Sequence, residues 1–341
     1  MPPSPHEDLP RAIAAVQRAA RVTRAVQRQI DPGSLEKGDK SPVTTADFAS
    51  QAVVCETLGT DTPLVGEEDA AELRGGSANF LDRVVTAVAE AGLDADGETV
   101  CSWIDRGGHD GSGDRYWTLD PIDGTKGCLR GQQYAISLAL IEAGEIVLGV
   151  LGCPNLPAEG VGCDRPLEDD VKGILQWAVR GQGAYCQSLT AEGVDQSTQL
   201  SASEVTAAKA VRMCESVESG HSSHSHSARI AARLGIEVDP VRLDSQAKYA
   251  LVARGDAEAY LRLPTRPGYQ EKIWDHAGGV IVLQEAGGRV SDVEGRPLDF
   301  ARGSTLAGNR GVIATAAAVH DEVLSTVAAV LAEDSSGHAT S

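Results

Sequence analysis

The stretch YWTLDPIDGTKGCLRG, residues 116–131, ends a short apolar run with two aspartates, Asp120 and Asp123, that stand three positions apart. Two like charges at this spacing repel each other unless solvent or a cation separates them. Pro121 lacks a backbone donor and fixes its own φ, which predicts that the strand ends here in a sharp turn. Such a turn can direct both carboxylates and the carbonyl oxygen of Ile122 at one point, and oxygen ligands of this kind suit Mg²⁺.

Gly124, Thr125 and Lys126 follow the two acids at once and supply backbone N–H groups with little side-chain obstruction. If a helix begins here, its free N–H groups form an anion site beside the carboxylates. A phosphate, with metal ions between it and the acids, is the anion that fits this arrangement. The stretch is also compatible with an ordinary acidic turn, because Asp-Pro and Asp-Gly are both common turn formers.

Four further acids favour the metal site over the plain turn. Glu67 and Glu68 end an apolar strand, where an unpaired carboxylate pair is costly unless it is exposed or neutralised. Asp275 stands at the start of an apolar helix, where it could also be an N-cap. Asp47 lies in the first turns of a helix and could simply complement the helix dipole. Each acid has a structural explanation alone, but together with the stretch 116–131 they indicate a metal-dependent phosphate site.

Composition limits the class of protein and its partners. The chain has 341 residues, 42% of them hydrophobic and 23% charged, with a formal net charge of −19. This is typical of a globular protein with two domains or two lobes, and the negative charge argues against nucleic-acid or anionic-membrane binding. The seven cysteines are odd in number and form no CxxC pair, which indicates reduced thiols. Without the apolar core of a signal peptide or an apolar run of about 20 residues, we expect a cytoplasmic protein.

The N-terminal half alternates helical and strand patterns. Residues 9–30 have apolar positions at helical spacing, and a second helix is expected from Thr44 or Thr45 to Leu58. Residues 70–114 are polar and rich in glycine toward their end, which predicts a loop or flap. Two apolar runs flank Ala143-Gly144 and predict a strand–turn–strand unit.

The C-terminal half has a different texture. Short strands such as AVRMC and AEAYLRL alternate with helical runs, which indicates an α/β arrangement. The last helix places Val319, Val323, Val327 and Leu331 on one face. Residues 333–341 are expected to be a disordered tail.

Several motifs carry a resemblance to a known family. WTLDPIDGTKG together with WDHAGG resembles the paired signatures of the lithium-sensitive, Mg²⁺-dependent phosphatases of the inositol monophosphatase superfamily. SPVTTADFASQAVV, LVGEED, VESGHSSHS, LDSQAKYALVARGDAEAYLRLP and YQEKIWDHAGG are similar, in that order, to the 3'(2'),5'-bisphosphate nucleotidase branch of that superfamily. The resemblance spans about residues 10–330.

The resemblance implies a fold and an activity. The fold class is α/β, as the layered αβαβα sandwich of the inositol monophosphatase and fructose-1,6-bisphosphatase type. An α+β N-terminal lobe (residues 1–157) would carry the metal motifs, and an α/β C-terminal lobe (158–332) would bind the nucleotide. The implied reaction is hydrolysis of the 3'-phosphate of 3'-phosphoadenosine 5'-phosphate to AMP and phosphate, in sulfur assimilation, by a monomer that uses two or three Mg²⁺ ions.

The resemblance also implies roles for individual residues. Metal ligands would be the carboxylates of Glu67, Asp120, Asp123 and Asp275, with the backbone carbonyl of Ile122. Asp47 and Thr125 would position and deprotonate the attacking water. The substrate would be bound by Gly124, Thr125, His221, Ser245, Lys248, Arg262 and Asp275. Lys248 and Arg262 are cations suited to phosphate, Lys as a point charge and Arg as a fork.

Other functions remain open on the sequence. An inositol polyphosphate 1-phosphatase or a sugar bisphosphatase would share the fold, and a catalytically silent nucleotide sensor would share the binding motifs. No GxxxxGK[ST] occurs, which excludes a P-loop NTPase. His221 and His224 stand three apart, but no Cys or acid in their loop completes a zinc set.

Two positions depart from the family pattern. Cys128 stands where an aromatic is usual, which predicts looser packing behind the phosphate loop and an exposed thiol near the site. Gly278 stands where Ala is frequent, and we expect it to lower helix stability by up to about 1 kcal/mol without changing the chemistry.

Overall fold

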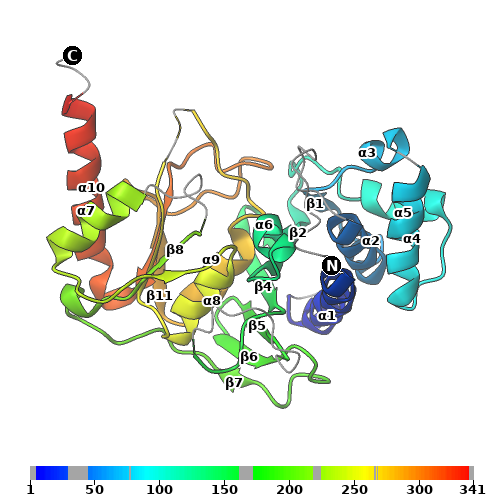
Figure 1. The fold of residues 1–341 in the computed structure, drawn as a ribbon, viewed down its shortest axis with the longest axis horizontal. Coiled ribbons are helices and arrows are strands. Elements are labelled where there is room, and N and C mark those ends of the chain that lie inside the picture. Colours follow the sequence, from blue (N-terminus) through cyan, green and yellow to red (C-terminus); the bar gives the residue numbers. More distant parts are fainter. Residues whose placement is uncertain are drawn as a thin grey trace.

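Helices and sheets alternate in layers along the long axis of the molecule (Figure 1). The computed structural model describes residues 5–29, 45–76, 78–160, 172–217, 224–264, 266 and 268–337. From right to left in Figure 1, an N-terminal helical layer is followed by a seven-stranded sheet, the helices α8 (Ala247–Arg254) and α9 (Ala277–Glu285), a five-stranded sheet, and the helices α7 (His224–Leu234) and α10 (His320–Gly337). The expected αβαβα sandwich is therefore confirmed.

The first sheet follows chain order, and its β1–β2 pair is parallel while the other pairs are antiparallel. Its strands are β1 (Leu64–Gly66), β2 (Arg115–Asp123), β3 (Ala135–Glu142), β4 (Glu145–Cys153), β5 (Ile174–Val179), β6 (Ala184–Ser188) and β7 (Thr198–Gln199). β3 is buried on both faces up to its last residue, because helices cover both sides of the sheet. Ala143 and Gly144, both with positive φ, form the expected turn between β3 and β4.

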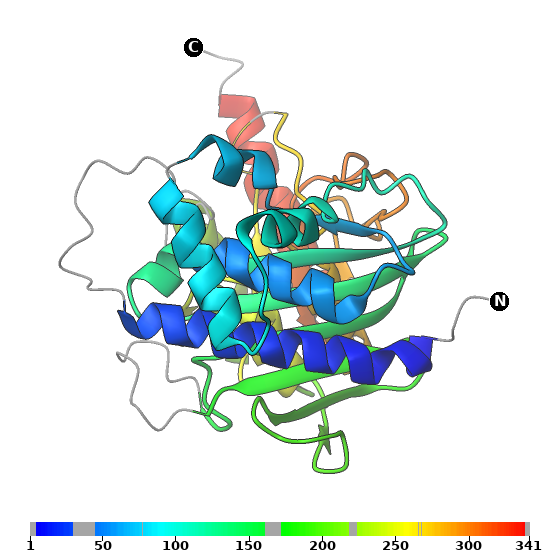
Figure 2. The same cartoon turned by 90° about the vertical axis from the view of Figure 1, so that its right-hand side faces the viewer.

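The helical layer covers the outer face of this sheet. α1 (Pro5–Gln29) and α2 (Thr45–Leu58) cross in front of the strands in Figure 2. Leu9, Ile13, Val16 and Ala20 of α1 are buried and repeat at helical spacing, as expected from the sequence.

Residues 70–114, predicted as a loop or flap, contain three helices instead. They are α3 (Ala70–Gly75), α4 (Ala78–Glu90) and α5 (Gly97–Asp105). Asp69 and Asp96 cap α3 and α5 by accepting hydrogen bonds from backbone N–H groups. Val84 and Val88, one helical turn apart, are fully buried. Much of the polar sequence that made the segment look like a loop therefore belongs to the caps and exposed faces of helices.

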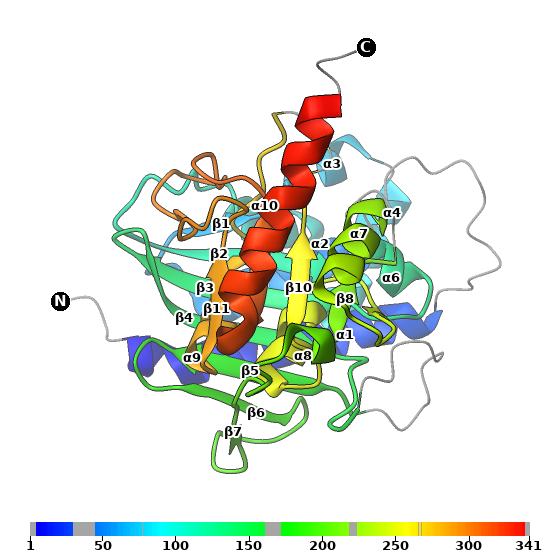
Figure 3. The same ribbon diagram turned by 90° about the vertical axis from the view of Figure 1, so that its left-hand side faces the viewer.

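The second sheet has the strand order β11-β12-β10-β8-β9. Its strands are β8 (Met213–Glu215), β9 (Val241–Arg242), β10 (Ala259–Arg262), β11 (Gly288–Ser291) and β12 (Val312–Ala316), and short 3₁₀ turns lie at Ala208–Ala210 and Ala317–Val319. α7 and α10 lie over its outer face (Figure 3). Val323, Val327 and Val330 of α10 pack into the core there, together with Val319 just before the helix.

Three boundaries differ from the sequence expectations. β5, β6 and β7 lie beyond residue 157 and pair with the first sheet, so that sheet extends past the expected lobe boundary. β2 does not end at Pro121 but continues to Asp123, with a shift of register between Asp120 and Asp123. α10 continues to Gly337, into the segment expected to be a disordered tail.

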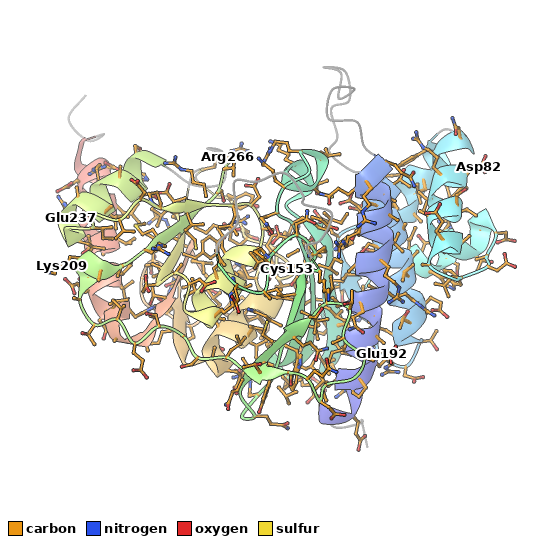
Figure 4. The ribbon with its side chains drawn as sticks, turned by 60° about the horizontal axis from the view of Figure 1, so that its bottom comes forward. Asp82, Cys153, Glu192, Lys209, Glu237 and Arg266 are labelled. Atoms are coloured by element: carbon orange, nitrogen blue, oxygen red, sulfur yellow. The ribbon has the colours of Figure 1, made fainter. Side chains whose placement is uncertain are left out.

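The remaining helix, α6 (Thr125–Leu129), follows β2 directly and lies near the middle of the molecule. In Figure 4, Asp82 of α4 and Glu237 lie toward opposite ends of the long axis, and Cys153, at the end of β4, lies between them. None of the helices in the described residues is long and apolar enough to cross a membrane.

Candidate active site

A cavity of about 380 Å³ lies where the end of β2 and α6 meet α8, β10 and the segment before α9. Ten of the predicted site residues line it: Glu67, Asp120, Ile122, Asp123, Gly124, Thr125, Ser245, Lys248, Arg262 and Asp275. They come from five separate parts of the chain, which the two sheets bring together.

The two acids of the opening stretch are held by an irregularity at the end of β2. Asp120 pairs with Ser137 of β3, and the ladder resumes at Asp123 after a shift in register. The Asp120 carboxylate accepts a hydrogen bond from the N–H of Ile122 at 3.1 Å. Asp123 accepts one from the N–H of Gln246 at 2.6 Å, which comes from the other lobe. The expected convergence of carboxylates thus arises from a bulged strand and not from a strand-ending turn.

Burial and mutual repulsion raise the pKa values of these carboxyl groups. Asp120 is only 2% exposed, and burial, followed by the charges of Glu67 and Asp123, raises its pKa well above the usual range. Burial and the charge of Asp275 raise the pKa of Asp123 to about 6, although Lys248 and Arg262 oppose the shift. The side chain of Glu67 opens onto the cavity, yet desolvation by the surrounding protein, with the charges of Asp275 and Asp47, raises its pKa to about 8.

Thr125 and Asp47 form a contact at the edge of the cavity. The Thr125 hydroxyl lies 3.4 Å from Asp47 Oδ1 and 3.2 Å from the carbonyl oxygen of Ile122. Asp47 is in the first turn of α2 and is 2% exposed; it reaches the cavity through Thr125 and does not itself line it. Gly124 precedes the helix with φ 87°, and a Cβ there would stand 3.0 Å from the Cβ of Ser245. A left-handed residue without a side chain is thus required where the two lobes meet.

Both of the cations predicted to bind the substrate line the cavity from the C-terminal lobe. Lys248 is 2% exposed, its ammonium donates to the carbonyl oxygen of Leu243 at 3.2 Å, and burial lowers its pKa. Arg262 is shared between two carboxylates, with Nε 2.8 Å from Glu271 and Nη2 3.1 Å from Asp275. Its pairing with Glu271 was not apparent from the sequence.

The residues present fit a divalent metal ion of the hard type. The donors on one side of the cavity are carboxylate oxygens of Glu67, Asp120, Asp123 and Asp275, and oxygen ligands suit Mg²⁺ or Mn²⁺. Burial and mutual repulsion raise the pKa values of Glu67, Asp120 and Asp123, and a cation would relieve the repulsion. Ligand atoms of Glu271, Asp275 and His276 lie within 4.8 Å of one another, but Arg262 is paired with the two carboxylates of this group.

Some site residues differ from the sequence expectations. His221 lies outside the described residues. Lys126, expected at the anion site, also lines the cavity. The sequence analysis missed six further lining residues: Ser216, Asp244, Tyr260, Tyr269, Lys272 and Trp274. Lys272 and Trp274 stand beside Asp275 in the motif EKIWDH, so their position in the sequence was a usable signal.

Cys128 does not expose a thiol to the site, as had been expected. It is fully buried and packs with Ala46, Ile122 and Tyr134. Burial also raises its pKa, which makes the thiol unreactive. Tyr134 supplies the aromatic packing near this position.

Comparison with known proteins identifies the family. The model of the inositol monophosphatase family matches residues 7–330, and the chain belongs to this family. It is 46% identical to a protein of Schizosaccharomyces pombe named 3'(2'),5'-bisphosphate nucleotidase, over 95% of each chain. A protein of Oryza sativa with the same name is 44% identical over 90% of each chain. In fold, the chain is similar to the IMPase of Thermotoga maritima, with a TM-score of 0.62, 20% identity, and coverage of 96% of this chain and 99% of the other.

Proposed function

We propose that this protein is a Mg²⁺-dependent 3'(2'),5'-bisphosphate nucleotidase. It hydrolyses the 3'-phosphate of 3'-phosphoadenosine 5'-phosphate to AMP and phosphate, and also accepts the corresponding 5'-phosphosulfate. The observation that carries the proposal is one cavity in which four carboxylates face Lys248 and Arg262, with the Thr125–Asp47 contact at its edge. The nucleotidases of S. pombe and O. sativa, similar over nearly the whole chain, support the substrate.

In this proposal the acids hold two or three Mg²⁺ ions through Glu67, Asp120, Asp123, Asp275 and the Ile122 carbonyl. When bound, such ions polarise the phosphate and lower the pKa of water, so that hydroxide is available at neutral pH. No covalent phosphoenzyme is needed. The protein acts in the cytoplasm as a monomer, in sulfur assimilation.

The protein's own groups then orient the reactants. The Thr125 hydroxyl donates toward Asp47, which leaves its oxygen free to accept a proton from the attacking water. The proton can pass from the water to Thr125 Oγ1 while the Thr125 proton passes to Asp47 Oδ1. Lys248 and Arg262, with Ser245, Gly124 and His221, hold the nucleotide and its second phosphate.

Phosphate release tests the proposal. The substrates are 3'-phosphoadenosine 5'-phosphate, inositol 1,4-bisphosphate, fructose 1,6-bisphosphate and AMP, each with Mg²⁺ or with EDTA. We expect Mg²⁺-dependent release that is strongest on the first, with AMP untouched. A preference for another bisphosphate would overturn the nucleotide contacts but keep the metal site. Nucleotide binding without any hydrolysis would favour a silent sensor.

Two neighbouring glutamates offer a matched pair of variants. Glu67 lines the cavity, whereas Glu68 does not. The backbone N–H of Glu68 donates to the side-chain oxygen of Gln51 at 3.0 Å, and the carbonyl oxygen of Glu68 accepts from the Gln51 side-chain nitrogen at 2.7 Å. Glu67→Gln should lower kcat by at least about 10²-fold, as expected for loss of a group that acts in the transition state. Glu68→Gln should lower kcat much less than Glu67→Gln, because its carboxylate does not line the cavity and acts there only through its charge near Asp47 and Glu67. Equal losses in the two variants would contradict the assignment of Glu67.

A further inference from the structure

Gln246 lies in the motif DSQAKY, between the substrate residues Ser245 and Lys248, and none of the roles proposed above uses it. The residue is 2% exposed and directly precedes α8. Its side-chain oxygen accepts hydrogen bonds from Ser137 Oγ and from the N–H of Gly279, both at 3.0 Å. Its side-chain nitrogen donates to the carbonyl oxygen of Trp274 at 2.8 Å. One buried amide thus connects β3, α8 and α9.

Two of these three bonds lead to a neighbour of a proposed metal ligand, and the third holds the first turn of α9. Ser137 is the cross-strand partner of Asp120. Trp274 directly precedes Asp275 in the chain. The backbone N–H of Gln246 itself donates to Asp123 at 2.6 Å. The positions of three carboxylates, which come from both lobes, therefore depend on Gln246.

The backbone before Gln246 supports the same interpretation. Ser245 has φ 75°, a left-handed conformation that L residues rarely adopt, and Ala143 in a hairpin turn is the other such residue in the described part of the chain. Strained backbone persists where its surroundings hold it, and it is common at functional sites. Here the left-handed residue directly precedes the N–H that donates to Asp123.

We propose that Gln246 is a positioning residue that holds Asp120, Asp123 and Asp275, from both lobes, at the spacing that a divalent cation requires. The inference rests on the proposed function, because it concerns the ligands of that site. Hydrogen-bond partners of metal ligands typically change metal affinity by about 10- to 100-fold when they are removed. A glutamine that merely filled the core would affect folding stability without affecting metal affinity.

The test compares two buried glutamines. Gln246→Met removes the amide at nearly constant volume, and Gln176→Met does the same in β5, away from the cavity. Gln176 is fully buried and donates to the carbonyl oxygen of Ala250 at 3.1 Å, in the same helix α8. The probe is Mn²⁺ added to metal-free protein, with free Mn²⁺ measured by electron paramagnetic resonance. Urea denaturation of each variant gives its stability.

Gln246→Met keeps the backbone bond to Asp123 but removes the side-chain bonds beside Asp120 and Asp275, so we expect it to raise the Kd for Mn²⁺ by about tenfold, the lower end of the range for direct partners of ligands. Gln176→Met should keep the Kd within about twofold of the wild type. The KM for the bisphosphate, measured at saturating metal, should change less than the Kd. Equal Mn²⁺ affinity in both variants would overturn the proposal and leave Gln246 as a structural residue.

If Gln246→Met does not fold, Ser137→Ala decides the question, since it removes only one of the four bonds. A weaker Mn²⁺ affinity in Ser137→Ala supports the proposal, and an unchanged affinity overturns it. Failure of the proposed function would look different, because the wild-type protein itself would then bind no Mn²⁺ or release no phosphate from any bisphosphate.

Discussion

Gly278 and Gly279, adjacent residues in the first turn of α9, allow a test of packing against helix propensity. Replacing either by Ala should favour the helix by up to about 1 kcal/mol, because Gly is the poorer helix former. The two positions differ in what a new Cβ would meet. At Gly278 it would stand 2.5 Å from the Ser137 hydroxyl oxygen, and at Gly279 it would stand 2.4 to 2.8 Å from atoms of Tyr249, from its ring to its Cβ.

The expected cost follows from how freely each neighbour can move. The Ser137 hydroxyl can rotate away, at the cost of its hydrogen bond to Gln246, which is worth about 1 kcal/mol. Gly278→Ala should therefore be close to neutral. Tyr249 is fully buried, and its hydroxyl lies 2.9 Å from His276 Nδ1, so it cannot rotate away. Overpacking of this kind costs about 1–3 kcal/mol, and Gly279→Ala should be less stable than Gly278→Ala by about 2 kcal/mol.

Urea denaturation followed by circular dichroism measures the difference. Because both variants share the same propensity gain, their difference in free energy of unfolding isolates the packing cost. The slope of free energy against urea concentration should be the same in both. If Gly279→Ala proved as stable as Gly278→Ala, the rigid contact with Tyr249 would be refuted. The sequence analysis expected Gly278 only to lower the stability of its helix. The structure adds a steric reason for a glycine here, because a Cβ would meet the Ser137 hydroxyl.

Three other predictions concern charge. Mg²⁺ should raise the Tm of the metal-free protein at pH 7.5, because a cation relieves repulsion among the cavity acids. Asp120→Asn should reduce that rise in Tm. A thermal scan with and without EDTA measures the rise, and an equal rise in the variant would contradict the prediction. Burial lowers the pKa of His320 to about 4, below its ordinary value of 6.5, because it disfavours the charged imidazole. Between these two pH values the unfolded chain binds more protons than the folded protein. The contribution of neutral His320 to stability is therefore complete above pH 6.5 and is lost as the pH falls toward 4. Urea midpoints at pH 7.5 and pH 5 should therefore differ less in His320→Gln than in the wild type, and an equal difference would contradict the shift. Asp8→Ala removes a buried carboxylate that pairs with Arg11 and Arg115, and it should cost about 1–3 kcal/mol in urea; a cost near zero would show that the pair contributes nothing.

The convergence of the acids on one cavity could be predicted from the sequence because each lies in a short motif whose local chemistry is unusual. Asp120 and Asp123 stand three positions apart around a proline, and Asp275 opens an apolar helix. What the sequence could not supply was the geometry. β2 runs through Pro121 because the register shift leaves that part of the ladder unpaired, so the missing donor costs little.

Tertiary contacts explain the features that the sequence analysis missed. Residues 70–114 did contain a usable signal for α4, because Phe80, Val84 and Val88 recur at helical spacing and pack in one cluster, but the polar and glycine-rich end of the segment obscured it. The burial of Cys128 depends on Tyr134, which comes from the next turn of the chain, and on Ala46 from a distant helix. The pairing of Arg262 with Glu271 joins two positions whose proximity only the folded second lobe creates.

The charges of the cavity explain why a chain with a net charge of −19 can bind a polyanion. Long-range repulsion is screened over about 8 Å at physiological salt, so the local arrangement decides. On one side Lys248 and Arg262 attract phosphate, and on the other four carboxylates would repel it. Two unit charges about 4 Å apart interact by about 4 kcal/mol at the effective dielectric of a protein surface. A phosphate placed beside the uncompensated acids would therefore bind poorly, and the cation must neutralise them first. We therefore expect metal binding and substrate binding to be cooperative. Under the proposal above, the bonds that Gln246 makes to both lobes contribute to the free energy that couples these two binding events.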